Sequence, residues 1–211
     1  MAHLKSPEQI AKAIGAVSNG TLPSATDEKF LAMLDAVHPR LEEALNIPTL
    51  VLSDYTDTFE VAKRFPSTIE VFRLTGGFLT NDEVTVTDAN GDTIDASRLL
   101  INRAMGTIGI ERVATGRYTV TYRAGFAVQD GTTELYDVPD EHKWLGECLI
   151  AHALIWFRTM QSQIKAPEGI SFNAIMTPLY RDLQSRIYMR YQRPRAGMHW
   201  PLHAERTPVT A

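Results

Sequence analysis

Two pairs of side chains in this sequence have a spacing that could support chemistry. Cys148 and His152 lie four residues apart, so on a helix they would share a face, as a thiolate with its base or as two metal ligands. A metal site needs more than two ligands, and the apolar residues around Cys148 disfavour the thiolate. His199 and His203 have the same spacing, but Pro201 between them argues against a helical ligand pair. We therefore expect Cys148 to be a packed core residue.

Acidic clusters are the other candidates for chemistry. Two groups could be read as paired carboxylates: Asp54, Asp57 and Glu60, and Glu42 with Glu43. Solvated surface is the usual role of such residues, and nothing in the sequence marks their pKa as raised. The sequence has no phosphate-binding glycine loop, no Gly-x-Ser-x-Gly turn, no His-Glu-x-x-His helix and no two-Cys, two-His finger. We expect no enzyme, no cofactor and no metal ion.

The charge is distributed unevenly along the 211 residues. The net charge is -4, but the segment from Thr177 onward holds six basic and two acidic residues, which leaves -8 for the rest. Arginine alternates there with tyrosine and tryptophan, a mixture that suits phosphate and base stacking and that protein interfaces also prefer. Because the acidic remainder would repel DNA, we favour a protein partner. The candidate partner-binding residues are Arg186, Arg190, Tyr191, Arg193, Arg195, His199 and Trp200.

The single cysteine and the content of apolar residues limit which classes of protein this chain can belong to. One cysteine excludes an intramolecular disulfide and fits a reducing compartment. The longest apolar stretch, residues 149–157, is far below the ~20 residues that span a bilayer, and the N-terminus lacks a secretory pattern. With 44% hydrophobic residues the chain can bury one sizeable core. We expect a soluble protein that is not secreted through a signal peptide.

Helices are predicted on both sides of the middle of the chain. A capping pattern at Ser6, Pro7 and Gln9 starts a short first helix. Apolar residues at helical spacing predict a second helix over residues 27–46, which Pro39 either kinks, as we favour, or splits.

A long central helix with a wide apolar face is predicted over residues 137–163. Thr177 and Pro178 cap a last helix that ends at Pro194. The residues beyond Pro194 have no periodicity and should be extended.

The middle of the chain alternates β-branched, aromatic and polar residues, which predicts a small antiparallel sheet of about five strands. Asn90-Gly91 is typical of a tight hairpin. The predicted strand segments are residues 69–74, 83–87, 93–94, 99–101, 109–111 and 117–123.

These elements define an α+β protein: a mainly helical body, a small inserted antiparallel β-sheet lobe and an extended C-terminal tail. The predicted segments are N-terminal helices over 1–66, the β lobe over 67–126, central and C-terminal helices over 127–193, and a docking tail over 194–211. Too few apolar residues recur in the tail for it to fold alone, so we expect it to order on a partner.

Two stretches resemble the head-to-tail connector (adaptor, or head completion) family of tailed bacteriophages. Residues 116–126, GRYTVTYRAGF, are similar to the family's last strand and its Tyr-x-Ala-Gly-aromatic ending. Residues 138–143, VPDEHK, lead into IAHALIWF at 150–157, similar to the family's Val-Pro start and its apolar helix with an Ala-His pair. The likeness covers about 25–191, and the aromatic-Glu-Asn-Arg ending frequent in relatives is absent.

The resemblance implies a structural protein of the virion neck, present in the host cytoplasm during assembly, with no catalytic residues. It implies a homo-oligomeric ring that matches the portal's twelvefold symmetry, with double-stranded DNA passing through without specific binding. The C-terminal segment would reach into the portal protein, and the next neck or tail protein would lie below the ring. From the residues alone, a DNA-binding module that uses the basic, aromatic C-terminal segment stays the alternative.

Overall fold

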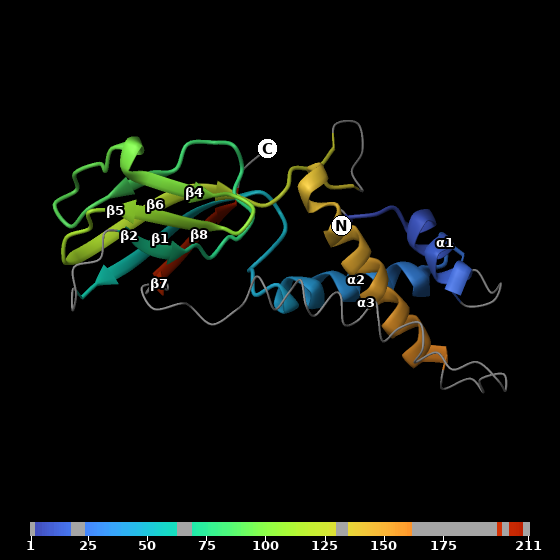
Figure 1. Cartoon of the computed structure of the whole chain (residues 1–211). Helices are drawn as coiled ribbons and strands as arrows, with labels where there is room; N and C mark the ends of the chain where they lie inside the picture. Colours follow the sequence, from blue (N-terminus) through green and yellow to red (C-terminus); the bar gives the residue numbers. More distant parts are fainter. Residues whose placement is uncertain are drawn as a thin grey trace. The chain divides into compact units, whose positions relative to one another are not determined.

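The structure is a computed structural model of the chain (Figure 1). It separates into two compact units: a helical unit, Met1–Asn46 with Val128–Tyr191, and a β unit, Ile47–Ala127 with Gln192–Ala211. The residues described are 3–17, 24–62, 69–129, 135–161, 198–199 and 203–208. For three of these segments only the backbone is described: 155–161, 198–199 and 203–208.

Three helices form the described part of the helical unit. They are α1 (Pro7–Val17), α2 (Glu28–Ala44) and α3 (Trp144–Gln161), with a 3₁₀ turn, η2 (Asp140–His142), just before α3. The predicted capping pattern begins α1, because Gln9 N–H donates to Ser6 Oγ (3.3 Å) and Ser6 N–H donates to Gln9 Oε1 (3.1 Å). Asp27 caps α2 by accepting from Lys29 N–H (2.8 Å), and α2 continues through Pro39 as one helix.

The central helix α3 packs against both α1 and α2. Buried side chains surround most of its described part: Leu145, Cys148, Leu149, Ala151, Ala153 and Leu154. The predicted wide apolar face is therefore confirmed where side chains are described. Within the described residues, no helix combines the length and apolarity needed to cross a membrane.

Two four-stranded sheets form the described part of the β unit. The first sheet has the order β3-β6-β1-β8, made of β3 (Thr85–Thr87), β6 (Gly116–Ala124), β1 (Ser53–Val61) and β8 (His203–Pro208). The second has the order β4-β5-β2-β7, made of β4 (Leu99–Asn102), β5 (Thr107–Glu111), β2 (Ile69–Arg73) and β7 (Met198–His199). Neighbouring strands are antiparallel except β2 and β7, which are parallel, and a 3₁₀ turn, η1 (Ala96–Arg98), leads into β4.

One core lies between the two sheets, so the β unit is a sandwich. Phe72 of the second sheet packs edge-on against Phe59 of the first (ring centroids 4.9 Å apart) and tilted against Tyr118 (6.1 Å). Around these rings the inward residues of both sheets are buried, while every second residue of β1 and β6 faces outward. The β unit therefore has one buried interior between the sheets and two outer faces.

The predicted strands at 69–74, 83–87, 99–101, 109–111 and 117–123 correspond to β2, β3, β4, β5 and β6. The hairpin at Asn90-Gly91 is also present. Asp88 Oδ1 accepts from Asn90 N–H (2.8 Å) and Asp92 N–H (3.0 Å), and Gly91 has φ +86°. Thr87 pairs with Thr93 across the turn.

The predicted α+β class is confirmed, but the described residues do not support a mainly helical body with a small sheet. The described residues form three α-helices and eight strands in two sheets. The sequence reading missed β1 in particular, which lies inside the segment 1–66 that was assigned to helices. Because β1 is central in its sheet, paired with both β6 and β8, it enlarges the predicted lobe into a sandwich.

The described parts of the predicted docking tail are strands at the edges of these sheets (Figure 1). Pro208 to His203 of β8 pair with Ser53 to Thr58 of β1, and His199 of β7 pairs with Phe72 of β2. In these described parts the tail of the single chain is ordered on its own β unit. The predicted last helix, residues 177–194, lies outside the described residues.

Candidate functional site

Strand β1 sends two carboxylates to opposite faces of its sheet. Its odd-numbered residues, Ser53 to Val61, are buried, so Asp57 points into the sandwich and is fully buried, whereas Asp54 points outward and is half exposed. Asp57 was expected to be a solvated acid, and this expectation is wrong. The alternation of Tyr55, Asp57 and Phe59 with polar residues is the sequence pattern that could have revealed it.

Asp57 holds the turn that follows β2. Its Oδ2 accepts from Thr75 N–H (2.7 Å) and from the Tyr122 hydroxyl (2.8 Å), and the Tyr122 oxygen in turn accepts from Gly76 N–H (2.8 Å). Oδ1 has no hydrogen-bond partner among the described residues. Burial raises the pKa of Asp57, opposed by the hydrogen bonds from Thr75 and Tyr122.

Tyr122 is correspondingly hard to ionise. Burial first, and then the nearby Asp57 carboxylate, raise the pKa of the Tyr122 hydroxyl. The hydroxyl therefore remains a donor to Asp57 over the accessible pH range. Its ring stacks on Tyr55 (centroids 5.5 Å apart, 12° between planes), which fixes its direction.

Two turns interlock beside this buried network. Leu74 N–H donates to Gly106 O (2.9 Å), and Leu79 N–H donates to Arg103 O (3.2 Å), so residues 103–106 lie directly against residues 74–79. Gly77 (φ +79°) and Gly106 (φ +59°) both adopt left-handed backbone. A Cβ on Gly106 would collide with the carbonyl of Gly77, so the close approach requires glycine.

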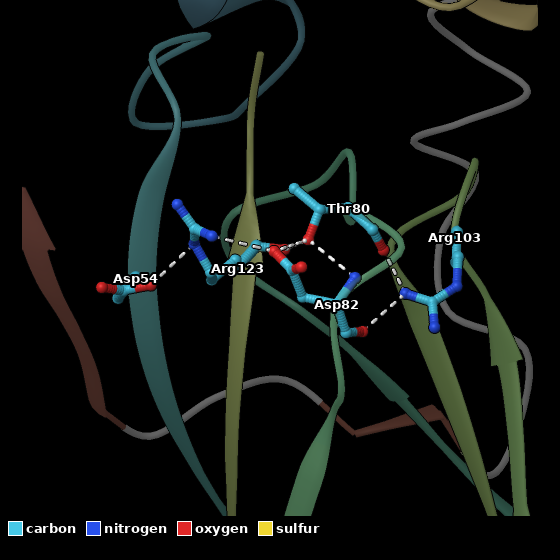
Figure 2. Close-up of polar contacts among 5 residues, drawn as sticks. All are labelled: Asp54, Thr80, Asp82, Arg103 and Arg123. Carbon is cyan, nitrogen blue, oxygen red and sulfur yellow. Dashed lines mark hydrogen bonds and ion pairs between the residues drawn. The ribbon is translucent and has the colours of Figure 1, made fainter. Parts of the chain in front are cut away.

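An exposed ion-pair network continues from these turns (Figure 2). Arg123 of β6 lies between two carboxylates, with Nε 3.2 Å from Asp54 and Nη1 3.1 Å from Asp82. Thr80 Oγ1 donates to Asp82 Oδ2 (2.9 Å). Arg103 donates to the carbonyls of Thr80 and Asp82, the latter at 3.1 Å. The chain 80–82 is thus fixed from both sides.

We call this region the loop end: residues 75–82, residues 103–106, Asp54 and Arg123. Every charged group in Figure 2 has its partner within the chain, so the region has the properties of a preshaped contact surface. Its described contacts include no nucleophile paired with a base, as a catalytic site would need, and no set of oxygen atoms directed at one point, as a metal site would need. Among the described residues, no group of three or more His, Cys, Asp or Glu could hold a metal ion.

The Tyr-x-Ala-Gly-aromatic ending has a physical explanation at the loop end. Tyr122 holds Asp57, and Ala124 packs where a Cβ on Gly76 would come within 2.7 Å. Gly125 has φ +99° and lies against the backbone of Val51, and Phe126 is buried against Phe78 (centroids 5.3 Å apart). The motif is therefore structural: it ends β6 and closes the loop end.

The other candidate pair, Cys148 and His152, lies on α3. Cys148 is buried, as expected for a core residue. His152 is partly buried, and burial followed by the charge of Arg40 lowers its pKa. Among the described residues the pair does not belong to a group of three or more His, Cys, Asp or Glu that could hold a metal ion.

Of the predicted partner-binding residues, only His199 lies within the described residues, where its backbone pairs with β2. The others, Arg186, Arg190, Tyr191, Arg193, Arg195 and Trp200, lie outside them. Whether these residues lie close together therefore stays a prediction. The sequence placed the loops of the inserted sheet second to the C-terminal segment as a docking surface, without naming residues there, and Asp54 was considered only as part of an acidic cluster.

No protein-family model matches the chain, and no curated protein matches its sequence. Among solved structures, the chain is similar to one described as the virion of a native gene transfer agent (GTA) particle. That similarity has a TM-score of 0.41 and 14% identity, and it covers 83% of this chain and 88% of the other.

Proposed function

We propose that this chain is a structural adaptor of a tailed-bacteriophage neck, a non-enzymatic subunit that forms a ring, docks on the portal and connects head to tail. The observation that supports it best is the place of the two motifs. GRYTVTYRAGF forms β6 and the junction that closes the loop end, and Val138-Pro139 leads through η2 into the central helix α3. The first motif thus forms the last long strand of the β unit, and the second forms the start of the central helix, as the resemblance implies.

The described chemistry is also what a passive connector needs. A subunit that only joins partners requires fixed surfaces, and the loop end is fixed by paired charges and interlocked turns. An acidic remainder carrying -8 would let DNA pass through a ring without adhering. Portal protein, a lower neck or tail protein, and further copies of the chain are the partners of this proposal.

Two elements are candidates for docking on the portal: the C-terminal segment with its Arg, Tyr and Trp residues, and the loop end. A chain cut after Gln192 would remove β7 and β8 together with Arg193, Arg195 and Trp200, so it would disturb both sheets while leaving Arg186 and Arg190 in place. Point substitutions separate the two elements more cleanly than truncation.

The experiment combines imaging with binding. Purified chain is imaged with and without its cognate portal protein, and affinity for portal is measured for Trp200→Ala and for Arg193→Glu with Arg195→Glu. Exposed Arg112→Glu is the matched charge control. We expect a ring on the portal, and a loss of about 1–2 kcal/mol for Trp200→Ala if it is an anchor residue.

Two results would change the proposal. If Trp200→Ala and the double arginine variant bind portal like the control, docking belongs to the loop end, which Asp82→Lys then tests. If no ring and no portal complex form, and the chain instead binds duplex DNA with strong salt dependence, the DNA-binding alternative replaces the adaptor.

A further inference from the structure

The tip of the hairpin after β3 carries a dipeptide that can modify itself. In an asparagine the side-chain Cγ lies within reach of the backbone nitrogen of the next residue, and the two atoms can bond to close a succinimide ring. A Cβ on the next residue would crowd this approach, and glycine has none. Asn90 and Gly91 are both exposed, and a Cβ at position 91 would meet nothing within 4 Å. The tip therefore has room for the ring and for the water that would open it.

The other asparagines of the described residues lack this neighbour. Each is followed by a residue with a Cβ: Asn46 by Ile47, Asn81 by Asp82, and Asn102 by Arg103. Asn102 is also held in place, because its Oδ1 accepts from Met105 N–H (3.0 Å). Asn19 precedes Gly20, but both lie outside the described residues. Within the described part of the chain, Asn90 is therefore the asparagine best placed to react.

Hydrogen bonds to Asp88 hold the hairpin tip closed. Gly91 N–H donates to Asp88 O (3.1 Å), and Asp88 Oδ1 accepts from Asn90 N–H (2.8 Å) and from Asp92 N–H (3.0 Å). The Gly91 nitrogen must leave its hydrogen bond and lose its proton before it can attack Asn90. Because the tip is exposed, such local opening costs little free energy. The Asp88 carboxylate therefore controls how often the reacting conformation is reached.

We propose that Asn90 is a site of spontaneous deamidation and that the Asp88 carboxylate sets its rate. The Gly91 nitrogen gives its proton to a base in the solvent and bonds to Asn90 Cγ. The bond from Cγ to Nδ2 breaks, and Nδ2 takes a proton from water and leaves as ammonia. A water molecule then opens the succinimide at one of its two carbonyls, which gives either aspartate or isoaspartate, whose backbone runs through Cβ and Cγ. The reaction needs only water, and the inference does not depend on the adaptor role.

The modification would alter the hairpin in two ways. Either product replaces a neutral amide by a carboxylate between Asp88 and Asp92, and the like charges repel one another. Isoaspartate also adds one carbon to the backbone of the tip, which displaces the hydrogen bond from Ile94 N–H to Val86 O (2.8 Å). Val86 belongs to β3, the edge strand of the first sheet. Deamidation is therefore expected to loosen this edge as the chain ages.

Ageing of the purified chain tests the proposal. The full chain is incubated in mildly alkaline buffer, which favours loss of the backbone proton, and is then digested with trypsin. Cleavage after lysine and arginine gives the peptide 74–98, which holds Asn90, and the peptide 13–29, which holds Asn19. Mass spectrometry follows the conversion of amide to acid in each peptide, and fragmentation separates Asn90 from Asn81 and isoaspartate from aspartate. A sample digested without ageing corrects for reaction during the digestion.

Three variants test the control by Asp88. Asp88→Ala should accelerate deamidation of Asn90 roughly fivefold or more, because the tip loses two hydrogen bonds and opens more often. Asp92→Ala is the matched control, since it also removes a carboxylate but Asp92 takes part in the hydrogen bonds of the tip only through its backbone. Asp88→Asn keeps an acceptor oxygen at the same position and should react at nearly the natural rate.

Formation of the acid at Asn90 in the natural chain, with none at Asn81, supports the site. An aged chain that keeps the amide at Asn90, or that converts Asn81 equally fast, overturns it. Equal rates in Asp88→Ala and Asp92→Ala overturn the control by the Asp88 carboxylate. Because these measurements use the chain alone, none of their outcomes depends on whether it joins a portal.

Discussion

The helical unit and the β unit both bury titratable side chains, and burial shifts the pKa of a histidine down in one unit and that of a carboxyl group up in the other. In the helical unit His38 is buried, and burial, followed by the charge of His3, lowers the pKa of His38 to about 4. In the β unit burial raises the pKa of Asp57. The difference teaches that acid should loosen the first unit and favour the second, because protonation charges a histidine and neutralises a carboxylate.

The two buried groups also differ in how they are held. His38 stands among rings, with His3 at 5.4 Å and Tyr136 at 5.9 Å between centroids, and its Nε2 has no hydrogen-bond partner among the described residues. Asp57 is tied by two short hydrogen bonds to a backbone turn and a tyrosine. The helical unit depends here on packing, and the β unit on directed polar contacts and turn geometry.

The largest effect is expected where the two turns of the β unit meet. Gly106→Ala places a methyl group against the Gly77 carbonyl and forces a left-handed residue, at a cost of about 3 kcal/mol or more. Gly91→Ala is the matched control, since it has φ +86° but nothing within 4 Å, and should cost only about 1 kcal/mol. Chemical denaturation measures both, and equal losses would show that the turns do not interlock.

The acid response of the helical unit comes next in size. The lowered pKa of His38 means that its contribution to stability is present above the unfolded pKa of about 6.5 and is lost as pH falls toward 4, by about 3 kcal/mol. His38→Phe should remove this dependence. Hydrogen exchange between pH 7 and 4, followed in α2 peptides with β6 peptides as the internal reference, checks it. Unchanged acid sensitivity in the variant would assign the effect to other groups.

Tyr122→Phe is expected to cost about 2 kcal/mol, because buried Gly76 N–H loses its acceptor and Asp57 loses a donor. Tyr118→Phe is the matched control in the same strand. Its hydroxyl also makes two hydrogen bonds, to Ala114 N and O, but in a partly exposed place, so its loss should be smaller. If the two variants lose the same free energy of unfolding, burial of the Asp57 network does not add to the stabilisation that its hydrogen bonds provide.

A smaller effect is expected for Asp57→Asn, which keeps an acceptor for Thr75 and Tyr122. Because the folded pKa of Asp57 is raised, its stabilising contribution is full below the unfolded pKa of about 3.9 and is lost as pH rises through the folded value. The variant should therefore gain stability relative to the natural chain as pH rises. A difference that stays constant from pH 3 to 8, measured by denaturation, would contradict the raised pKa.

Sequence patterns predicted the elements whose local and tertiary preferences agree. The Ser6–Gln9 cap, the Asn90-Gly91 turn and the alternation of β6 all specify their structures within a few residues. Strand β1 was missed because its acids suggested solvent, although every second residue is buried. The strands β7 and β8 could not be predicted, since they form by edge pairing with distant strands and carry no apolar alternation of their own.

The contacts within the loop end could not be predicted for the same reason, although the loops of the inserted sheet were an alternative docking surface. Asp57 and Tyr122 are 65 residues apart and meet through the register of β1 and β6. Arg123 and Asp82 are 41 apart and meet because Leu79 pairs with Ala124 and Thr80 N–H donates to Arg123 O. The sequence does not predict that Gly77 and Gly106 lie against each other, because only the folded positions of the two turns bring them together. Long-range register, and not residue type, defines this site.

The smallest effect separates the surface of the loop end from its interior. Arg123→Gln removes two ion pairs whose members are one third to one half exposed, so it should cost less than about 1 kcal/mol. Salt screens exposed pairs, so the difference from the natural chain should shrink further at 1 M salt. Thermal denaturation at low and high salt measures it, with Arg123→Lys as the charge-preserving control. A loss of stability above about 2 kcal/mol that persists in salt would contradict this prediction. It would mean that the exposed ion pairs, and not the buried Asp57 network, contribute most to the stability of the loop end.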